Sequence, residues 1–76
     1  MGTKLQTGVL HKSFGARIIE LRNKKGLTQE KLAELINVDR SYMGFLERGE
    51  KNATLDKIGK IAKSLDVTIS DLFKGI

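Results

Sequence analysis

The chain has 76 residues, 14 of them Lys or Arg and nine Asp or Glu, and its net charge of +5 favours a polyanionic partner. A chain of this length forms one domain with a modest core, and the absence of cysteine excludes a disulfide framework and a thiolate metal site, as is typical of a reducing cytoplasm. The apolar runs are short, and residues 1–13 lack the hydrophobic core of a signal peptide, so we expect neither secretion nor a membrane span.

The first predicted helix spans about residues 13–25. Its buried face is indicated by apolar side chains at positions i, i+4 and i+7, namely Phe14, Ile18 and Leu21. Gly26 follows at the position where a left-handed residue commonly ends a helix. Residues 1–12 show no regular pattern, so we expect a flexible N-terminal arm before a folded domain of residues 13–76.

The second predicted helix begins after Thr28, whose hydroxyl suits an N-cap, and ends near Ile36. Its buried side is expected to comprise Leu32, Ala33, Leu35 and Ile36. Asn37 is one of the few residues besides glycine that tolerate a positive φ, so it can turn the chain. Asp39 is then placed to cap a third helix, and residues 28–49 have the outline of a helix-turn-helix.

The third predicted helix has two different faces when it is projected at about 100° per residue. One face carries the packing side chains Tyr42, Met43 and Leu46. The opposite arc, which we expect to stay free, combines two cations, a hydroxyl, an aromatic ring and a glycine that allows close approach: Arg40, Arg48, Ser41, Phe45 and Gly44. Gly49 closes the helix. Helices of this kind meet base edges in the major groove from their first turn, so the pattern favours DNA binding.

Two further helices complete the predicted all-α fold. Thr54 suits the N-cap of the fourth helix, whose apolar stripe comprises Leu55, Ile58, Ala62 and Leu65. Its other face carries a run that we interpret as solvated rather than as a second DNA site: Lys57, Lys60 and Lys63. Ser70 is expected to cap a short fifth helix that contains Leu72 and Phe73. Alternation typical of a strand occurs only at residues 67–69, which is too short to predict one.

Several motifs of the chain occur together in one family. They are RNKKG at residues 22–26, LTQE at 27–30, LA at 32–33, LERG at 46–49, and Ile61-Ala62 followed by Leu65 and the Leu72-Phe73 ending. From about Ser13 to Phe73 the chain resembles the Cro/C1-type, or XRE-type, helix-turn-helix regulators, and the resemblance implies a compact five-helix, lambda-repressor-like fold. The stretch of residues 40–52 is most similar to the controller proteins of restriction-modification systems, and phage and plasmid repressors share much of its pattern.

The resemblance and the side-chain chemistry together assign the expected DNA contacts. Arg40 can donate two hydrogen bonds to guanine O6 and N7, and Ser41 can bond a base or a phosphate. Phe45 either meets a thymine methyl group or packs over a neighbouring helix or a dimer partner. The family residue that matches Gln29 touches the phosphate backbone and steadies the first side chains of the recognition helix; the alternative here is an exposed first-turn side chain. Further phosphate contacts are expected from Thr28, Tyr42, Arg48, Lys51 and Asn52.

Some of these side chains also have structural interpretations. The Tyr42 ring is expected to be buried whichever role its hydroxyl has, and Asn52 could cap its loop instead of contacting phosphate. In related repressors the positions of Arg22 and Glu47 pair across two helices, and here the pair would orient the third helix.

The motif geometry predicts a homodimer on a palindromic site in double-stranded DNA, with its third helices in successive major grooves about 34 to 36 Å apart. The C-terminal part holds more apolar residues than a five-helix monomer needs, although some serve the core. We expect the dimer surface to draw on Leu65, Val67, Ile69, Leu72, Phe73 and Ile76. Such a dimer represses by occlusion or activates by touching RNA polymerase, and both modes stay open.

Catalysis has little support in the sequence. His11 is the only histidine, and the glycines are scattered rather than gathered in a phosphate-binding loop, so we expect no enzyme activity, metal site, cofactor or small-molecule ligand. Two alternatives to a DNA regulator remain. One is a protein-interaction module, such as an antitoxin, that uses the apolar C-terminus. The other is an RNA-binding protein, which lacks exposed aromatic platforms apart from Phe45.

Overall fold

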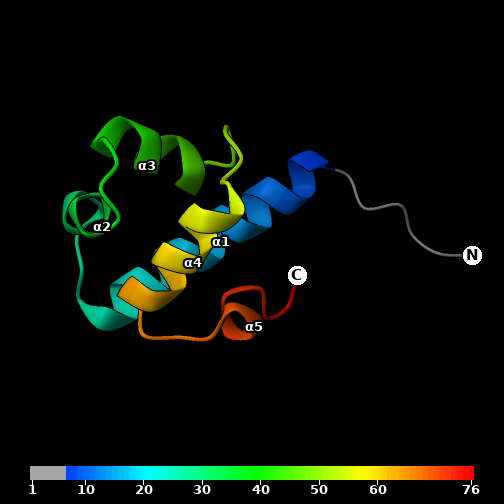
Figure 1. Cartoon of the computed structure of the whole chain (residues 1–76). Helices are drawn as coiled ribbons and strands as arrows, with labels where there is room; N and C mark the ends of the chain where they lie inside the picture. The colour runs from blue at the N-terminus through cyan, green and yellow to red at the C-terminus, as the bar shows by residue number, and fades with distance from the viewer. Residues whose placement is uncertain (1–6) are drawn as a thin grey trace, which may run out of the picture.

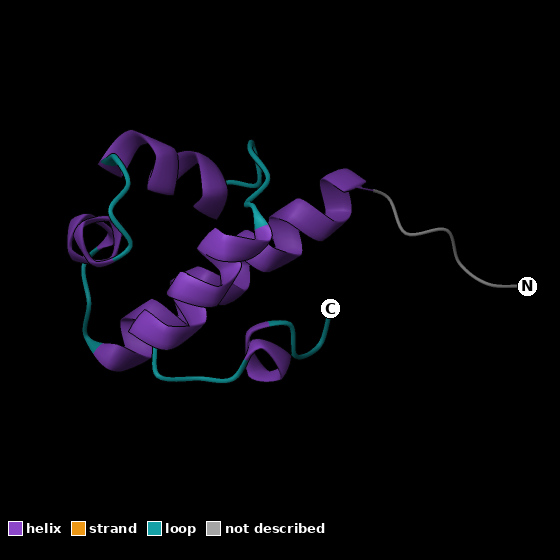
Figure 2. Cartoon of the chain, in the orientation of Figure 1, coloured by secondary structure: helices purple, strands orange, loops and turns teal. Residues whose placement is uncertain are grey.

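Residues 7–76 are described by a computed structural model, in which they form five helices and no strand (Figures 1 and 2). The helices are α1 (Thr7–Lys25), α2 (Gln29–Leu35), α3 (Arg40–Glu47), α4 (Leu55–Ser64) and α5 (Ile69–Leu72). This arrangement confirms the predicted all-helical fold with five helices. No helix in this part of the chain is both long enough and apolar enough to cross a bilayer.

Helix α1 is longer than the sequence pattern predicts, because it begins at Thr7 instead of at about residue 13. The expected arm of residues 1–12 is therefore wrong for residues 7–12, and residues 1–6 lie outside the described part of the chain. Extending an existing helix by six residues costs little once the helix has nucleated. The half-buried side chains of Leu10 and His11 add packing on this extra length.

Threonine hydroxyls cap three of the helices. The Oγ1 atoms of Thr28, Thr54 and Thr68 each accept a hydrogen bond from the backbone N–H three residues later, at 3.0 to 3.2 Å. The first two caps were predicted, but the predicted cap of α5 at Ser70 is wrong, because the helix starts at Ile69 and Ser70 lies inside its first turn. Asp39 occupies the N-cap position of α3 as expected, yet its side chain makes no capping hydrogen bond.

The four longer helices all end in the same way. A residue with positive φ follows each helix, and its N–H and the next N–H donate back to carbonyls of the last turn, which is a Schellman motif. The predicted positions Gly26, Asn37 and Gly49 have φ values of 74°, 58° and 74°. Asp66 has a φ of 58° and was not predicted, since aspartate is a less common choice there.

The core lies where α1, α2, α3 and α4 meet, and α5 closes one side of it (Figure 1). The predicted buried residues of α1 and the predicted Met43 and Leu46 of α3 belong to it. Two predicted core positions are wrong: Leu35 is 49% exposed and Leu55 is 76% exposed. Leu55 is the first residue of α4 and projects outward, and the core position on that helix is taken instead by Ile61, which is fully buried.

Helix α5 is attached to α1 by polar and aromatic contacts. The Arg17 guanidinium donates from Nε and Nη2 to the carbonyl oxygen of Asp71, at 3.0 and 2.9 Å. Its Nη1 atom donates to Glu20 at 2.9 Å, and this hydrogen bond, together with the positive charge of Arg17, lowers the pKa of the exposed Glu20 carboxyl. The rings of Phe14 and Phe73 stack with their centroids 4.9 Å apart.

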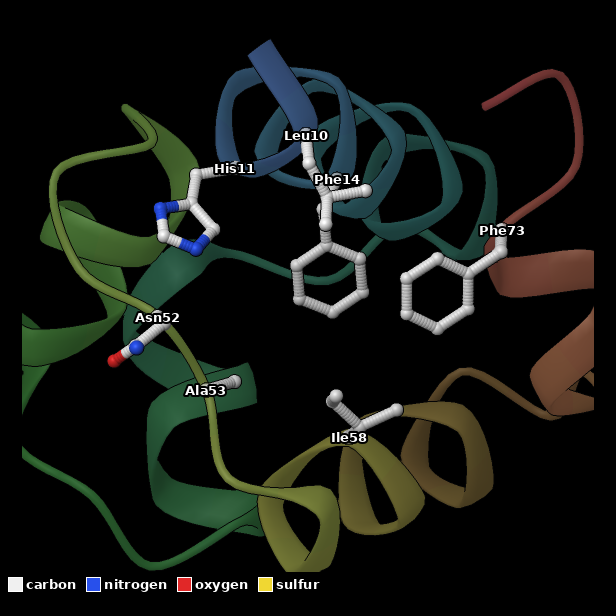
Figure 3. A pocket seen from close by; sticks show the side chains of 7 residues that line it. All are labelled: Leu10, His11, Phe14, Asn52, Ala53, Ile58 and Phe73. Atoms are coloured by element: carbon white, nitrogen blue, oxygen red, sulfur yellow. The ribbon is translucent and has the colours of Figure 1, made fainter. Parts of the chain in front are cut away.

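Next to this stack is a small cavity of about 140 Å³ between α1, the α3–α4 loop and α4 (Figure 3). His11 lines it opposite Asn52 and Ala53 of the loop, so the only histidine belongs to a packed helix and not to an irregular arm. The other lining residues are Leu10, Phe14, Ile58 and Phe73.

Candidate nucleic-acid interface

Helices α2 and α3 and the turn between them form the predicted helix-turn-helix (Figure 1). The turn is held by two backbone hydrogen bonds, from Asn37 N–H to the Glu34 carbonyl at 3.1 Å and from Val38 N–H to the Ala33 carbonyl at 2.9 Å. Ile36 and Val38 turn their side chains toward the core, fully buried and half-buried respectively. Backbone bonds and apolar packing therefore both determine the direction in which α3 leaves the turn.

Helix α3 exposes side chains at both ends of the face that was expected to stay free, but not at its middle. Arg40 and Ser41 in its first turn are exposed, as is Arg48 just after its last turn. Gly44 lies between them and is buried, because the side chains of Arg48 and Gln29 cover it. A Cβ atom added to Gly44 would lie 3.1 Å from Nη1 of Arg48 and 3.8 Å from Nε2 of Gln29. The glycine thus lets two hydrogen-bond donors lie flat against the helix.

The expected pair of Arg22 and Glu47 is present and fastens α3 to α1. Arg22 donates from Nε to Oε2 of Glu47 at 2.8 Å and from Nη2 to Oε1 at 3.1 Å, a bidentate geometry. The remaining donor Nη1 binds the carbonyl of Leu27 at 2.9 Å. Glu47 is only 7% exposed, so the pair lies largely out of water.

Gln29 joins the same network, which sequence reasoning missed. Its Nε2 donates to Oε1 of Glu47 at 3.0 Å, so its amide is oriented by the carboxylate that Arg22 holds. The amide oxygen accepts no hydrogen bond from residues 7–76. An amide fixed in this way at the N-terminus of α2 lies beside backbone N–H groups that suit an anion.

Tyr42 and Asn52 form a contact that connects α3 to the loop after it. The Tyr42 hydroxyl donates to the backbone carbonyl of Asn52 at 3.2 Å, and the ring packs against the core but is only partly buried, less than expected. The Asn52 side chain is exposed. Thr28 uses its hydroxyl oxygen as the α2 cap, which leaves the O–H free to donate to a phosphate.

Two cationic side chains lie over Phe45 near the end of α3, and an acidic side chain pairs with one of them. Arg48 and Lys51 both lie over the half-buried ring, and Arg48 also donates from Nε to Oε1 of Glu50 at 3.2 Å. The acidic member, Glu50, was not among the predicted interface residues. Its position two residues after Arg48 could have indicated it.

The predicted dimer surface is only partly at the surface of this chain. Leu65 and Leu72 are 4% and 0% exposed and belong to the core instead, because α5 folds back over α1 and α4. Val67 and Phe73 are half-buried against the same core. Ile69 and Ile76 are 47% and 43% exposed and remain available for contact.

A protein-family model, HTH_3, described as helix-turn-helix, matches residues 18–72. The chain belongs to this family. Among its relatives, control protein C.MunI of Mycoplasma sp is 39% identical over 64 residues, which are 83% of this chain and 86% of the relative. Control protein C.BamHI of Bacillus amyloliquefaciens is 42% identical over 60 residues, 78% of this chain and 74% of the relative.

The crystal structure of the restriction-modification controller protein C.AhdI from Aeromonas hydrophila superposes on this regulator with a TM-score of 0.77 and 49% sequence identity. The superposition covers 80% of this chain and 92% of that protein. The chain is therefore a DNA-binding transcriptional regulator of the HTH_3 type, close to restriction-modification controller proteins.

Proposed function

We propose that this regulator binds a palindromic operator in double-stranded DNA as a homodimer and controls restriction-modification genes from the cytoplasm. Each α3 would enter one of two successive major grooves, about 34 to 36 Å apart. The observation that carries the proposal is the solvent-facing arc of α3, which starts with Arg40 and Ser41 and lies on a helix fixed by the buried Arg22–Glu47 pair. A helix held so firmly presents its side chains at one defined angle.

The proposed roles are of two kinds: hydrogen bonds that read bases and contacts with the phosphate backbone. Arg40 reads guanine through a bidentate hydrogen bond, and Ser41 next to it bonds a base or a phosphate. Gln29 and the Thr28 hydroxyl contact phosphate at the N-terminus of α2. The phosphate contacts beyond the last turn of α3 come from Arg48, Lys51 and the Asn52 side chain. Tyr42 would reach phosphate only by releasing its hydrogen bond to the Asn52 carbonyl, and Gly44 allows the Arg48 and Gln29 side chains to lie close to α3.

The relatives indicate which genes are regulated. The position of the dimer relative to the promoter would determine whether it represses or activates. The named control proteins support restriction-modification genes as the targets. Bound over a promoter, the dimer would repress by occlusion, and bound upstream it would activate by contacting RNA polymerase.

Selection of bound duplexes from a random pool tests the proposal. The expected result is a palindrome whose half-sites are separated by one helical turn.

Arg40→Ala should then relax the preference at one or two guanines, a discrimination of about 1 to 3 kcal/mol. The matched variant Lys51→Ala should weaken binding to all duplexes and lower the salt slope by about one. Equal losses for Arg40→Ala on operator and random DNA would remove its base-reading role, and failure to enrich any motif would remove the proposal.

A further inference from the structure

The Phe45 ring is already in contact with two cations. The guanidinium carbon of Arg48 lies 5.1 Å from the ring centroid, and Nζ of Lys51 lies 5.2 Å from it. Both distances are within the roughly 6 Å over which an aromatic face attracts a positive charge. One ring from α3 therefore organises a cation from the helix end and a cation from the following loop.

The ion pair next to the ring is exposed, so Arg48 can exchange its Glu50 partner for a phosphate. Arg48 is paired with Glu50 at 3.2 Å, and the two side chains are 55% and 53% exposed. Exposed pairs of this kind contribute little to stability, since water screens them. A phosphate oxygen can replace the Glu50 carboxylate on Arg48 without breaking any buried interaction.

Long cationic side chains lose rotamer freedom when they bind, and holding them beforehand reduces that cost. The ring holds Arg48 and Lys51 in this way. A ring that is covered by two cations also presents less of its surface to a thymine methyl group. The restriction of the two cations and the coverage of the ring both indicate that Phe45 does not read bases as Arg40 does.

We propose that Phe45 is a positioning residue of the DNA interface, which holds Arg48 and Lys51 as a two-cation clamp on the phosphate backbone and reads no base. The inference rests on the proposed DNA binding and gives Phe45 a role other than the thymine contact or the packing that the sequence left open. The clamp grips any duplex, so its contribution is independent of sequence.

The test compares Phe45→Leu with Phe45→Tyr, because leucine keeps apolar bulk and tyrosine keeps the aromatic face. Affinity is measured over a salt series for the selected operator and for a random duplex. Phe45→Leu should weaken binding to both by the same factor, about three- to tenfold, and Phe45→Tyr should stay within about twofold of the unmodified protein. Because Phe45 acts through its cations, the loss from Phe45→Leu should shrink in a Lys51→Met background.

A loss on the operator alone would assign Phe45 to base reading, and a weaker dimer in sedimentation would assign it to subunit packing; either result overturns the clamp. An unchanged affinity for Phe45→Leu, or the same loss with and without Lys51, would overturn it as well. If the unmodified protein binds neither duplex, the proposed DNA binding fails instead.

A measurement on the unmodified protein does not depend on the folding of any variant. The ring current of Phe45 should move the side-chain proton resonances of Arg48 and Lys51 upfield in the NMR spectrum of the free protein. Lys60, an exposed lysine on α4, is the reference. Proton chemical shifts of Arg48 and Lys51 like those of exposed arginine and lysine side chains would contradict the clamp.

Discussion

The buried carboxylate of Glu47 fastens α3 to α1 and α2. A carboxylate that is 7% exposed is stable only if its charge is compensated, and Glu47 accepts two hydrogen bonds from Arg22 and one from Gln29. The Arg22–Glu47 pair was predictable from resemblance, because both positions lie in family motifs. The bond from Gln29 was not, since it depends on a distance between two helices that sequence spacing does not give.

Removing Arg22 should therefore destabilise the fold strongly. Arg22→Met leaves the buried Glu47 carboxylate with one weak partner, and we expect a loss of about 2 to 4 kcal/mol in the free energy of unfolding, measured by urea denaturation. The matched control is Lys31→Met, which breaks an exposed pair with Glu34 and should cost less than about 0.5 kcal/mol. Similar losses for the two variants would mean that the Glu47 network contributes no more than a surface pair.

At the scale of elements, Gly15 sets how closely α1 crosses α3. A Cβ atom at this position would overlap the backbone carbonyls of Leu46 and Glu47. The last turn of α3 thus lies against the backbone of α1. Hydrophobic periodicity identified both helices, but it carries no information on how closely their backbones approach, so the role of Gly15 could not be predicted. Periodicity also placed Leu55 in the core, but as the first residue of α4 it projects outward, and Ile61 is buried there instead.

Gly15→Ala should consequently lower the free energy of unfolding by about 1 to 3 kcal/mol, because a backbone carbonyl cannot move aside as a flexible side chain can. Gly59→Ala is the control within α4, where an added Cβ meets no atom within 4 Å. It should raise stability by about 0.4 to 1 kcal/mol, since alanine restricts the unfolded chain. Equal thermal and urea stability of Gly15→Ala and the unmodified protein would show that the two helices can separate at no cost.

At the scale of the whole molecule, the sequence predicted the number, order and type of the helices but not where the monomer ends and an interface begins. Leu65 and Leu72 have the same apolar character as Ile69 and Ile76, yet the first two are buried in the monomer and the last two are about half exposed. Only the path of α5 back across α1, fixed by Arg17 and the Phe14–Phe73 stack, separates them. The proposed dimer surface is thereby reduced to the exposed apolar side chains around α5.

Ile69 and Leu55 offer a matched test of that surface. Each is an exposed apolar residue in the first position of a helix, directly after a threonine N-cap, so an aspartate there has the same favourable interaction with the helix dipole. Ile69→Asp should raise the dimer dissociation constant by about tenfold or more, because it removes apolar area from the interface and places a charge there. Leu55→Asp should leave dimerisation unchanged. Sedimentation equilibrium measures both, and an equal effect of the two substitutions, or none for Ile69→Asp, would place the dimer contact away from α5.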